Sequence, residues 1–97
     1  MRQSTRLMTK SKTNSDTGHL QVIARAPFHI YFEGEAQVIS AENKVGPFDI
    51  LPDHADFFSM LKPCEIKIET DEDTISFNTS NGIISVQNNE VLLFVNM

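Results

Sequence analysis

The sequence has few of the features that would stabilise or localise a small protein by covalent or membrane means. Its single cysteine, Cys64, cannot form an internal disulfide, so packing must hold the fold together, which suits a reducing compartment. The longest apolar run, 91–95, is far shorter than the roughly 20 residues of a membrane-spanning helix. No apolar segment follows the basic N-terminus, which argues against a secretory signal, and no glycine-rich phosphate-binding loop is present.

Positive charge is scarce beyond the first eighteen residues. Residues 1–18 contain four basic residues and one acidic residue, whereas residues 19–97 contain four basic and twelve acidic residues. The first segment is rich in Ser and Thr and has no helical periodicity, so we expect a disordered basic tail over residues 1–18. The rest, 19–97, is long enough for one domain. Its acidic character would repel phosphate backbones, so we expect no nucleic-acid partner.

Short apolar runs separated by turn signals roughly every eight to twelve residues are typical of an antiparallel β-sandwich or barrel. They predict strands over 20–26, 29–32, 35–42, 64–70, 74–79, 83–87 and 91–96. In the third of these strands, we expect Ala36 and Val38 to share one face. The clearest strand begins at Cys64, because Cys64, Ile66 and Ile68 alternate with charged residues. The fold class predicted from this pattern is all-β.

One turn and two segments carry more specific expectations. Asn81-Gly82 is predicted to form a tight type I′ hairpin turn, because both residues tolerate positive φ angles. Residues 91–96 are apolar on both faces, so either this strand lies centrally between two sheets or something outside the chain covers its second face. Residues 57–61 fit a strand or a short helix equally well, and the sequence does not decide between them.

The run GPFDILPDHA, residues 46–55, resembles the hallmark of the epsilon subunit of F-type ATP synthases, which is called delta in mitochondria. The segments FEGEA (32–36), LKP (61–63) and NGIISV (81–86) extend this resemblance over about residues 19–97. Several separated segments therefore agree with the family, which is more specific than one short motif.

The chain departs from the family pattern at four positions. The family usually has glycine where this chain has Asp49, Asp53 and Cys64, and proline where it has Asp56. Each lost glycine makes a positive φ less favourable, although Asp tolerates the left-handed region better than most residues. We therefore expect the turn before the strand at Cys64 to adopt ordinary angles or to carry strain.

The resemblance implies a β-sandwich of about ten strands in the central stalk, with one face against the gamma subunit and one end near the c-ring of the membrane rotor. It implies a rotor subunit with no catalytic site or cofactor of its own, in proton- or ion-driven ATP synthesis. We expect it at the cytoplasmic face of a bacterial energy-coupling membrane, attached through the complex without direct insertion. Family members commonly continue into a C-terminal helical hairpin that inhibits ATP hydrolysis. This sequence stops at Met97, so we expect no inhibition by that route.

The resemblance also implies two sets of contact residues. The loop facing the c-ring would contain Pro47, Phe48, Asp49, Asp53 and His54. The interface with gamma would contain Phe57, Phe58 and Glu65. Two adjacent phenylalanines cannot both point inward in a strand, so one of them is the expected interface anchor.

Two other functions remain open. One is a free-standing sandwich that binds a peptide or sugar, which would have no affinity for gamma. The other is a small enzyme or a metal-dependent barrel, which would need His19, His29 and His54 to converge in space. His54 stands near Asp53 and other acidic residues, but their spacing matches no strong zinc or calcium motif. We therefore expect His54 to be a loop histidine bonded to the backbone.

Overall fold

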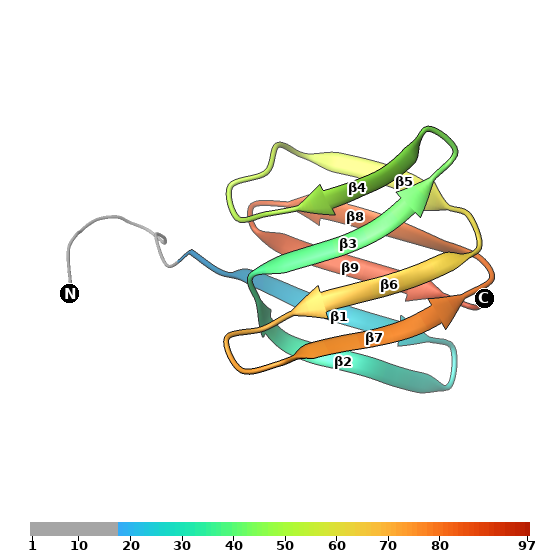
Figure 1. Cartoon of the computed structure of the whole chain (residues 1–97), viewed down its shortest axis with the longest axis horizontal. Coiled ribbons are helices and arrows are strands. Elements are labelled where there is room, and N and C mark those ends of the chain that lie inside the picture. Colours follow the sequence, from blue (N-terminus) through green and yellow to red (C-terminus); the bar gives the residue numbers. More distant parts are fainter. Residues whose placement is uncertain (1–17) are drawn as a thin grey trace.

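A computed structural model describes residues 18–97 as nine strands in two layers, and these residues contain no helix (Figure 1). The strands are β1 (Leu20–Ala26), β2 (His29–Ala36), β3 (Val38–Asn43), β4 (Gly46–Ile50), β5 (Phe57–Leu61), β6 (Cys64–Glu69), β7 (Thr74–Thr79), β8 (Gly82–Gln87) and β9 (Glu90–Val95). The predicted all-β sandwich is confirmed. The predicted tail, 1–18, lies outside the described residues except for Gly18.

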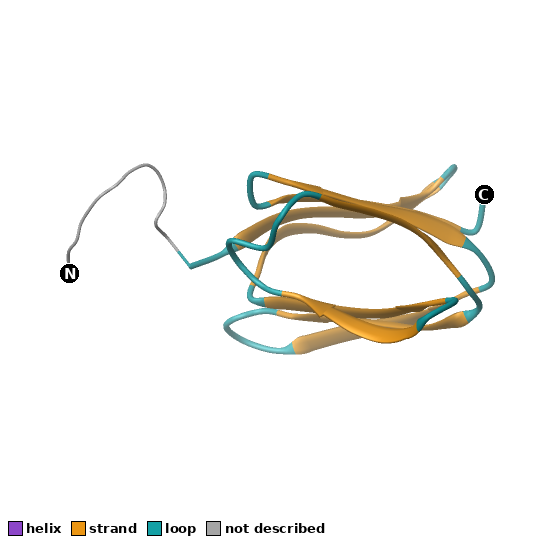
Figure 2. Ribbon diagram, turned by 90° about the horizontal axis from the view of Figure 1, so that it is seen from above, coloured by secondary structure: helices purple, strands orange, loops and turns teal. Residues whose placement is uncertain are grey.

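The two layers are a five-stranded and a four-stranded sheet packed face to face (Figure 2). The first has the order β2-β1-β9-β8-β5 and the second β4-β3-β6-β7. Every pair is antiparallel except β1 with β9, which run parallel with Val22 opposite Val91. The first and last strands of the described chain therefore lie side by side inside one sheet.

The expected strand 35–42 is wrong, because the chain changes sheets in the middle of it. Strand β2 continues through Gly34, which pairs with Val22, and ends at Ala36. Strand β3 begins two residues later in the other sheet, after Gln37 donates its backbone N–H to the carbonyl of Glu69 (2.7 Å). Ala36 and Val38 consequently do not share a strand face.

The type I′ hairpin predicted at Asn81-Gly82 is also wrong. Strands β7 and β8 belong to different sheets, and neither Asn81 nor Gly82 has a positive φ. Glycine is needed at 82 for space, because an added Cβ would lie 2.9 Å from Cγ1 of Val95. The two-residue hairpin lies instead between β8 and β9, where Asn88 and Asn89 adopt φ angles of 53° and 62°, as a type I′ turn requires.

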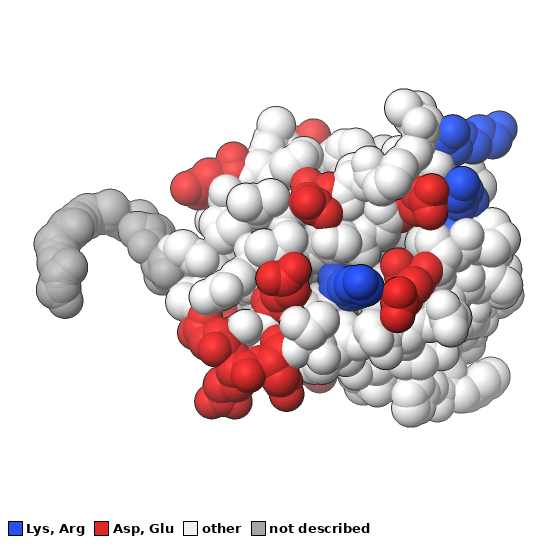
Figure 3. Space-filling model, viewed as in Figure 1, with Lys and Arg blue, Asp and Glu red and all other residues white. Residues whose placement is uncertain are grey.

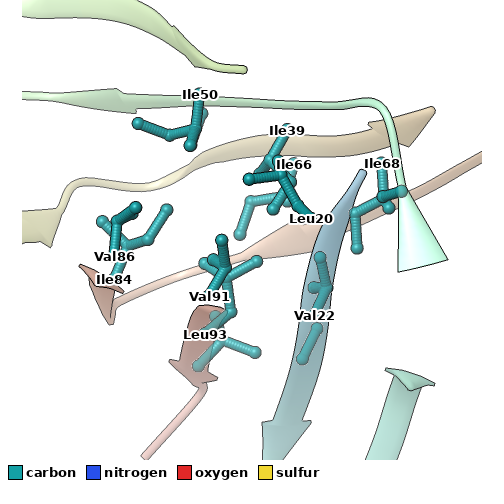
Figure 4. Packing of buried hydrophobic residues seen from close by; sticks show 14 of the residues in the cluster. Leu20, Val22, Ile39, Ile50, Ile66, Ile68, Ile84, Val86, Val91 and Leu93 are labelled. Atoms are coloured by element: carbon teal, nitrogen blue, oxygen red, sulfur yellow. The ribbon is translucent and has the colours of Figure 1, made fainter. Parts of the chain in front are cut away.

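The core lies between the inner faces of the two sheets and is almost entirely aliphatic (Figure 4). Alternate residues of each strand point into it, as the period of two dictates. Its fully buried large side chains are Leu20, Val22, Ile39, Ile50, Ile66, Ile68, Ile84, Val86, Leu93 and Val95. The inward positions predicted for the clearest strand, Ile66 and Ile68, are confirmed, whereas Cys64 is half-buried.

Candidate protein interface

The outer face of the five-stranded sheet is unusually apolar. One row of outward side chains crosses β5, β8, β9 and β1 at Phe58, Ser85, Leu92 and Ile23. The next row crosses all five strands at Met60, Ile83, Phe94, Arg25 and Ile30. Six large side chains in these rows are exposed: Ile23 (40%), Ile30 (51%), Phe58 (67%), Met60 (72%), Leu92 (48%) and Phe94 (36%). We call these six residues the apolar face.

Strand β9 explains why this surface is apolar. It lies in the middle of the five-stranded sheet, where Leu93 and its alternate neighbours face the core. Leu92 and Phe94 point the other way, where no second sheet covers them. Within residues 18–97, the first of the two alternatives, a strand covered by sheets on both faces, is therefore wrong. A contiguous exposed apolar patch in a small domain marks an interaction site.

A hollow lies beside this apolar face, because two small residues stand among larger ones. It is lined by Gly34 and Ser85 together with Ile23 and Leu92. Its polar lining residues are Gln21, Glu33, Gln87 and Glu90, two of which are acidic. A partner side chain that enters this hollow would meet apolar side chains and carboxylates.

The outer face of the four-stranded sheet is polar by contrast (Figure 3). Its outward residues on β6 and β7 include Glu65, Lys67 and Ser76, all exposed. On the neighbouring strands, the hydroxyl of Ser40 donates to Asp49 Oδ1 (2.7 Å). Figure 3 also shows that acidic side chains gather at the end with the β6–β7 turn and basic ones toward the β3–β4 turn.

The structure does not bring the three predicted gamma-contact residues together. Residues 57–61 are a strand, and Phe58 points outward while Phe57 packs against the core. Phe57 also meets the ring of Phe48, with the two centroids 5.2 Å apart. Glu65 lies on the outer face of the other sheet, because β6 belongs to the four-stranded layer. Only Phe58 is part of the apolar face.

The predicted c-ring loop is only partly a loop. Pro47, Phe48 and Asp49 lie in β4, an edge strand, where a proline without an N–H is tolerated. Phe48 is half-buried against the core. Asp53 and His54 do lie in the loop between β4 and β5.

The loop contains a tight turn that explains one of the replaced glycines. Asp53 has a φ of 66°, and the N–H of His54 donates to the carbonyl of Leu51 (3.2 Å). Proline followed by a residue with positive φ is typical of a type II turn, and glycine favours that second position. Asp49 and Cys64 lie in strands without positive φ, so ordinary angles are adopted before β6.

The three histidines do not converge. His19 contacts Asp71 (3.1 Å) just before β1, whereas His29 follows β1 at the opposite end and packs edge-on against Tyr31. His54 Nδ1 lies 2.8 Å from the carbonyl oxygen of Ala55, so the expected backbone bond is confirmed. Within residues 18–97, no three His, Cys, Asp or Glu side chains are grouped to hold a metal ion. Nor do these residues form a helix long and apolar enough to cross a membrane.

The described residues match one protein family over their whole length. The profile of the family described as ATP synthase, Delta/Epsilon chain, beta-sandwich domain matches residues 18–97. The chain belongs to this family. It is 40% identical over 68 residues to the ATP synthase epsilon chain of Clostridium novyi, covering 69% of this chain and 52% of the relative. It is 35% identical over 78 residues to that of Ruthia magnifica, covering 80% and 55%. The chain thus spans about half the length of these curated relatives.

Solved structures of ATP synthases contain the same fold. The mitochondrial ATP synthase of Euglena gracilis, solved with its F1 and c-ring, matches with a TM-score of 0.77 over 92% of this chain and 58% of the other, at 13% identity. The central stalk and c-ring structure from Tetrahymena thermophila matches with a TM-score of 0.68 over 78% and 62%, at 18% identity. At these identities the likeness establishes the fold alone.

Proposed function

We propose that this chain is a non-catalytic subunit of the central stalk of an F-type ATP synthase, where it links the gamma subunit to the c-ring of the membrane rotor. The apolar face is the observation that carries the proposal. It has the chemistry of a stable protein interface, and it belongs to a chain of the ATP synthase delta/epsilon family. A stalk subunit must transmit torque without shearing, and a sandwich with paired strands and a continuous core is a stiff body.

The gamma subunit would dock on the apolar face, with Phe58 as an anchor. Phe58 is 67% exposed on the edge strand β5, and buried aromatic side chains dominate the energy of protein interfaces. Phe57 supports this anchor from beneath, because it fixes β5 on the core. Glu65 faces away from this surface, so its contribution would require gamma to reach the other sheet as well.

Co-purification with gamma from the same genome tests this proposal. We expect a 1:1 complex with the natural chain and a loss of about 100-fold in affinity for Phe58→Glu, because a charge would be buried in an apolar contact. Ser76→Glu is the matched control, since it adds the same charge to the polar outer face. A folded Phe58→Glu chain that binds gamma normally would contradict the proposed surface.

The c-ring would meet the loop with Asp53 and His54, at the end of β4. The opposite end offers a competing surface, because Phe28 and Val45 are 100% and 97% exposed there. Single cysteines at His54 and Val45, each with Cys64→Ser, can be tested for cross-links to the c-ring in the assembled complex. Cross-links only from position 54 would support the loop, whereas cross-links only from position 45 would reverse the orientation.

The chain would lie at the cytoplasmic face of an energy-coupling membrane, attached through the rotor, and would need no cofactor. These 97 residues alone would leave ATP hydrolysis uninhibited, since the described residues contain no helix that could extend into the catalytic head. Strong suppression of ATPase activity, when the chain is added to its own complex, would contradict that expectation.

The free-standing binder is the second candidate, and the hollow beside the apolar face favours it. Its polar and apolar lining residues would accommodate part of a peptide or sugar. This candidate predicts a stable monomer that does not bind a correctly folded gamma subunit. Failure of the natural chain to form the 1:1 complex would therefore favour this candidate over the stalk.

A further inference from the structure

Two residues from distant turns hold each other through reciprocal hydrogen bonds. The backbone N–H of Asp53 donates to Asn89 Oδ1 (2.6 Å), and Asn89 Nδ2 donates to Asp53 Oδ1 (3.3 Å). Asp53 lies in the loop between β4 and β5, and Asn89 lies in the turn between β8 and β9. We call this pair of hydrogen bonds the Asp53–Asn89 clamp.

Both partners occupy backbone conformations that glycine would adopt more easily. The φ angles are 66° for Asp53 and 62° for Asn89. Glycine at either position would relieve the left-handed conformation, but it would remove one side chain of the clamp. Asp and Asn tolerate the left-handed region, and their side chains also carry the groups that form the two hydrogen bonds. These residue types therefore suit both the positive φ and the clamp.

The clamp connects the loop between β4 and β5 to the hairpin between β8 and β9. The turn in that loop is already closed by Pro52 and by the bond from His54 to Leu51. Asn89 adds a connection to the hairpin that leads into β9, the strand that carries Leu92 of the apolar face. The loop is therefore fixed relative to that face as well as within itself.

We propose that Asn89 is a positioning residue for the loop that carries His54. Through the clamp it holds the His54 ring edge-on to Phe57, with the two centroids 5.6 Å apart and an interplanar angle of 72°. Phe57 lies beside the exposed anchor Phe58 on β5. The clamp would thus set the spacing between the loop and the apolar face, the two surfaces assigned above to the c-ring and gamma. This consequence rests on the proposed function, whereas the positioning does not.

Glycine substitutions test the positioning, because they keep the backbone free to adopt positive φ. Asn89→Gly removes the amide while the turn remains possible, and Asn88→Gly is the matched control at the other position of the same turn. In the full chain, we expect hydrogen exchange at the Asp53 amide to become about tenfold faster in Asn89→Gly, the size expected for loss of one or two hydrogen bonds. The control should leave this rate unchanged.

The NMR chemical shifts of the His54 ring protons report where the ring lies. Loss of the Asp53–Asn89 hydrogen bonds would not change these shifts unless the ring moved. The ring protons should shift toward the values of a free histidine in Asn89→Gly and Asp53→Gly, because the ring would leave the edge-on contact with Phe57. Asp53→Asn should preserve the natural shifts, since an amide keeps the accepting oxygen. Unchanged shifts in Asn89→Gly, or equal shifts in Asn88→Gly, would overturn the proposal.

Binding measurements then separate this inference from the proposed function. If Asn89→Gly displaces His54 and weakens the c-ring contact while gamma binding persists, both stand. If the natural chain binds neither partner, the proposed function fails, while the exchange rates and ring shifts still decide whether Asn89 positions the loop.

Discussion

The outer face of the five-stranded sheet exposes Phe58, Met60 and Leu92, whereas that of the four-stranded sheet exposes Glu65 and Lys67. Both sheets bury their inner faces in the same aliphatic core. The apolar side chains of the first outer face therefore lie outside the contacts that hold the two sheets together. This difference separates the residues that stabilise the fold from those available to a partner.

Neighbouring leucines on β9 give the largest expected contrast. Leu93→Ala should lower the free energy of unfolding by about 2–5 kcal/mol, because Leu93 is fully buried and its loss leaves a cavity. Leu92→Ala should lower it by less than about 1 kcal/mol, since Leu92 is 48% exposed. Urea unfolding of the isolated chain measures both values. Equal losses would show that the apolar face also stabilises the sandwich.

A charge at the same outer position tests the interface itself. Leu92→Glu should weaken binding to gamma by about 100-fold, or about 2.7 kcal/mol, because an unpaired carboxylate would be buried in the contact. Isothermal titration with purified gamma measures the change. Circular dichroism must show that the variant remains folded, and normal affinity in a folded variant would place the gamma contact elsewhere.

Gly82 tests how closely β8 packs against β9, the strand that carries Leu92 and Phe94 of the apolar face. A Cβ on this residue would lie 2.9 Å from Cγ1 of Val95 and 3.2 Å from the backbone oxygen of Phe94. Gly82→Ala should therefore cost about 1–3 kcal/mol of stability by overpacking and push β9 away from β8. Thermal unfolding measures the cost, and an unchanged melting temperature would show that Val95 makes room for the added methyl group.

The smallest effect is expected on the polar outer face. Lys67→Leu exchanges an exposed charge for an apolar side chain between Ser40 and Ser76. We expect stability to change by less than about 0.5 kcal/mol and affinity for gamma by less than about twofold. A loss of gamma binding comparable to that of Leu92→Glu would mean that gamma contacts both sheets.

The fold could be predicted where the alternation of side chains was strict. Strand β6 alternates apolar and charged residues, so its inward positions at Ile66 and Ile68 followed directly. Strand β4 was missed because Gly46 and Pro47 are typical of a loop, yet an edge strand accommodates both. At Gly82 the local turn preference was overridden by close packing against β9.

The candidate site was predictable only in part. The period of two showed that one of Phe57 and Phe58 must point outward, and the structure places Phe58 there. The apolar face as a whole depends on the order of β5, β8, β9 and β1. That order joins Ile23 to Leu92 across nearly the whole described sequence, and no local pattern contains this information. The exposed Leu92 and Phe94 were signalled by a strand that is apolar on both faces.

The parallel pairing of β1 with β9 has a consequence for synthesis of the protein. A ribosome synthesises β1 before its parallel neighbour β9, and the seven strands β2–β8 lie between them in the sequence. Until β9 follows, one edge of β1 has no partner strand, and its unpaired backbone groups are available to other nascent chains. Closure of the sheet requires contacts between residues far apart in sequence, which slows folding. Closure of the five-stranded sheet therefore waits until β9 has been synthesised, and β1 is open to pairing with other chains in the meantime.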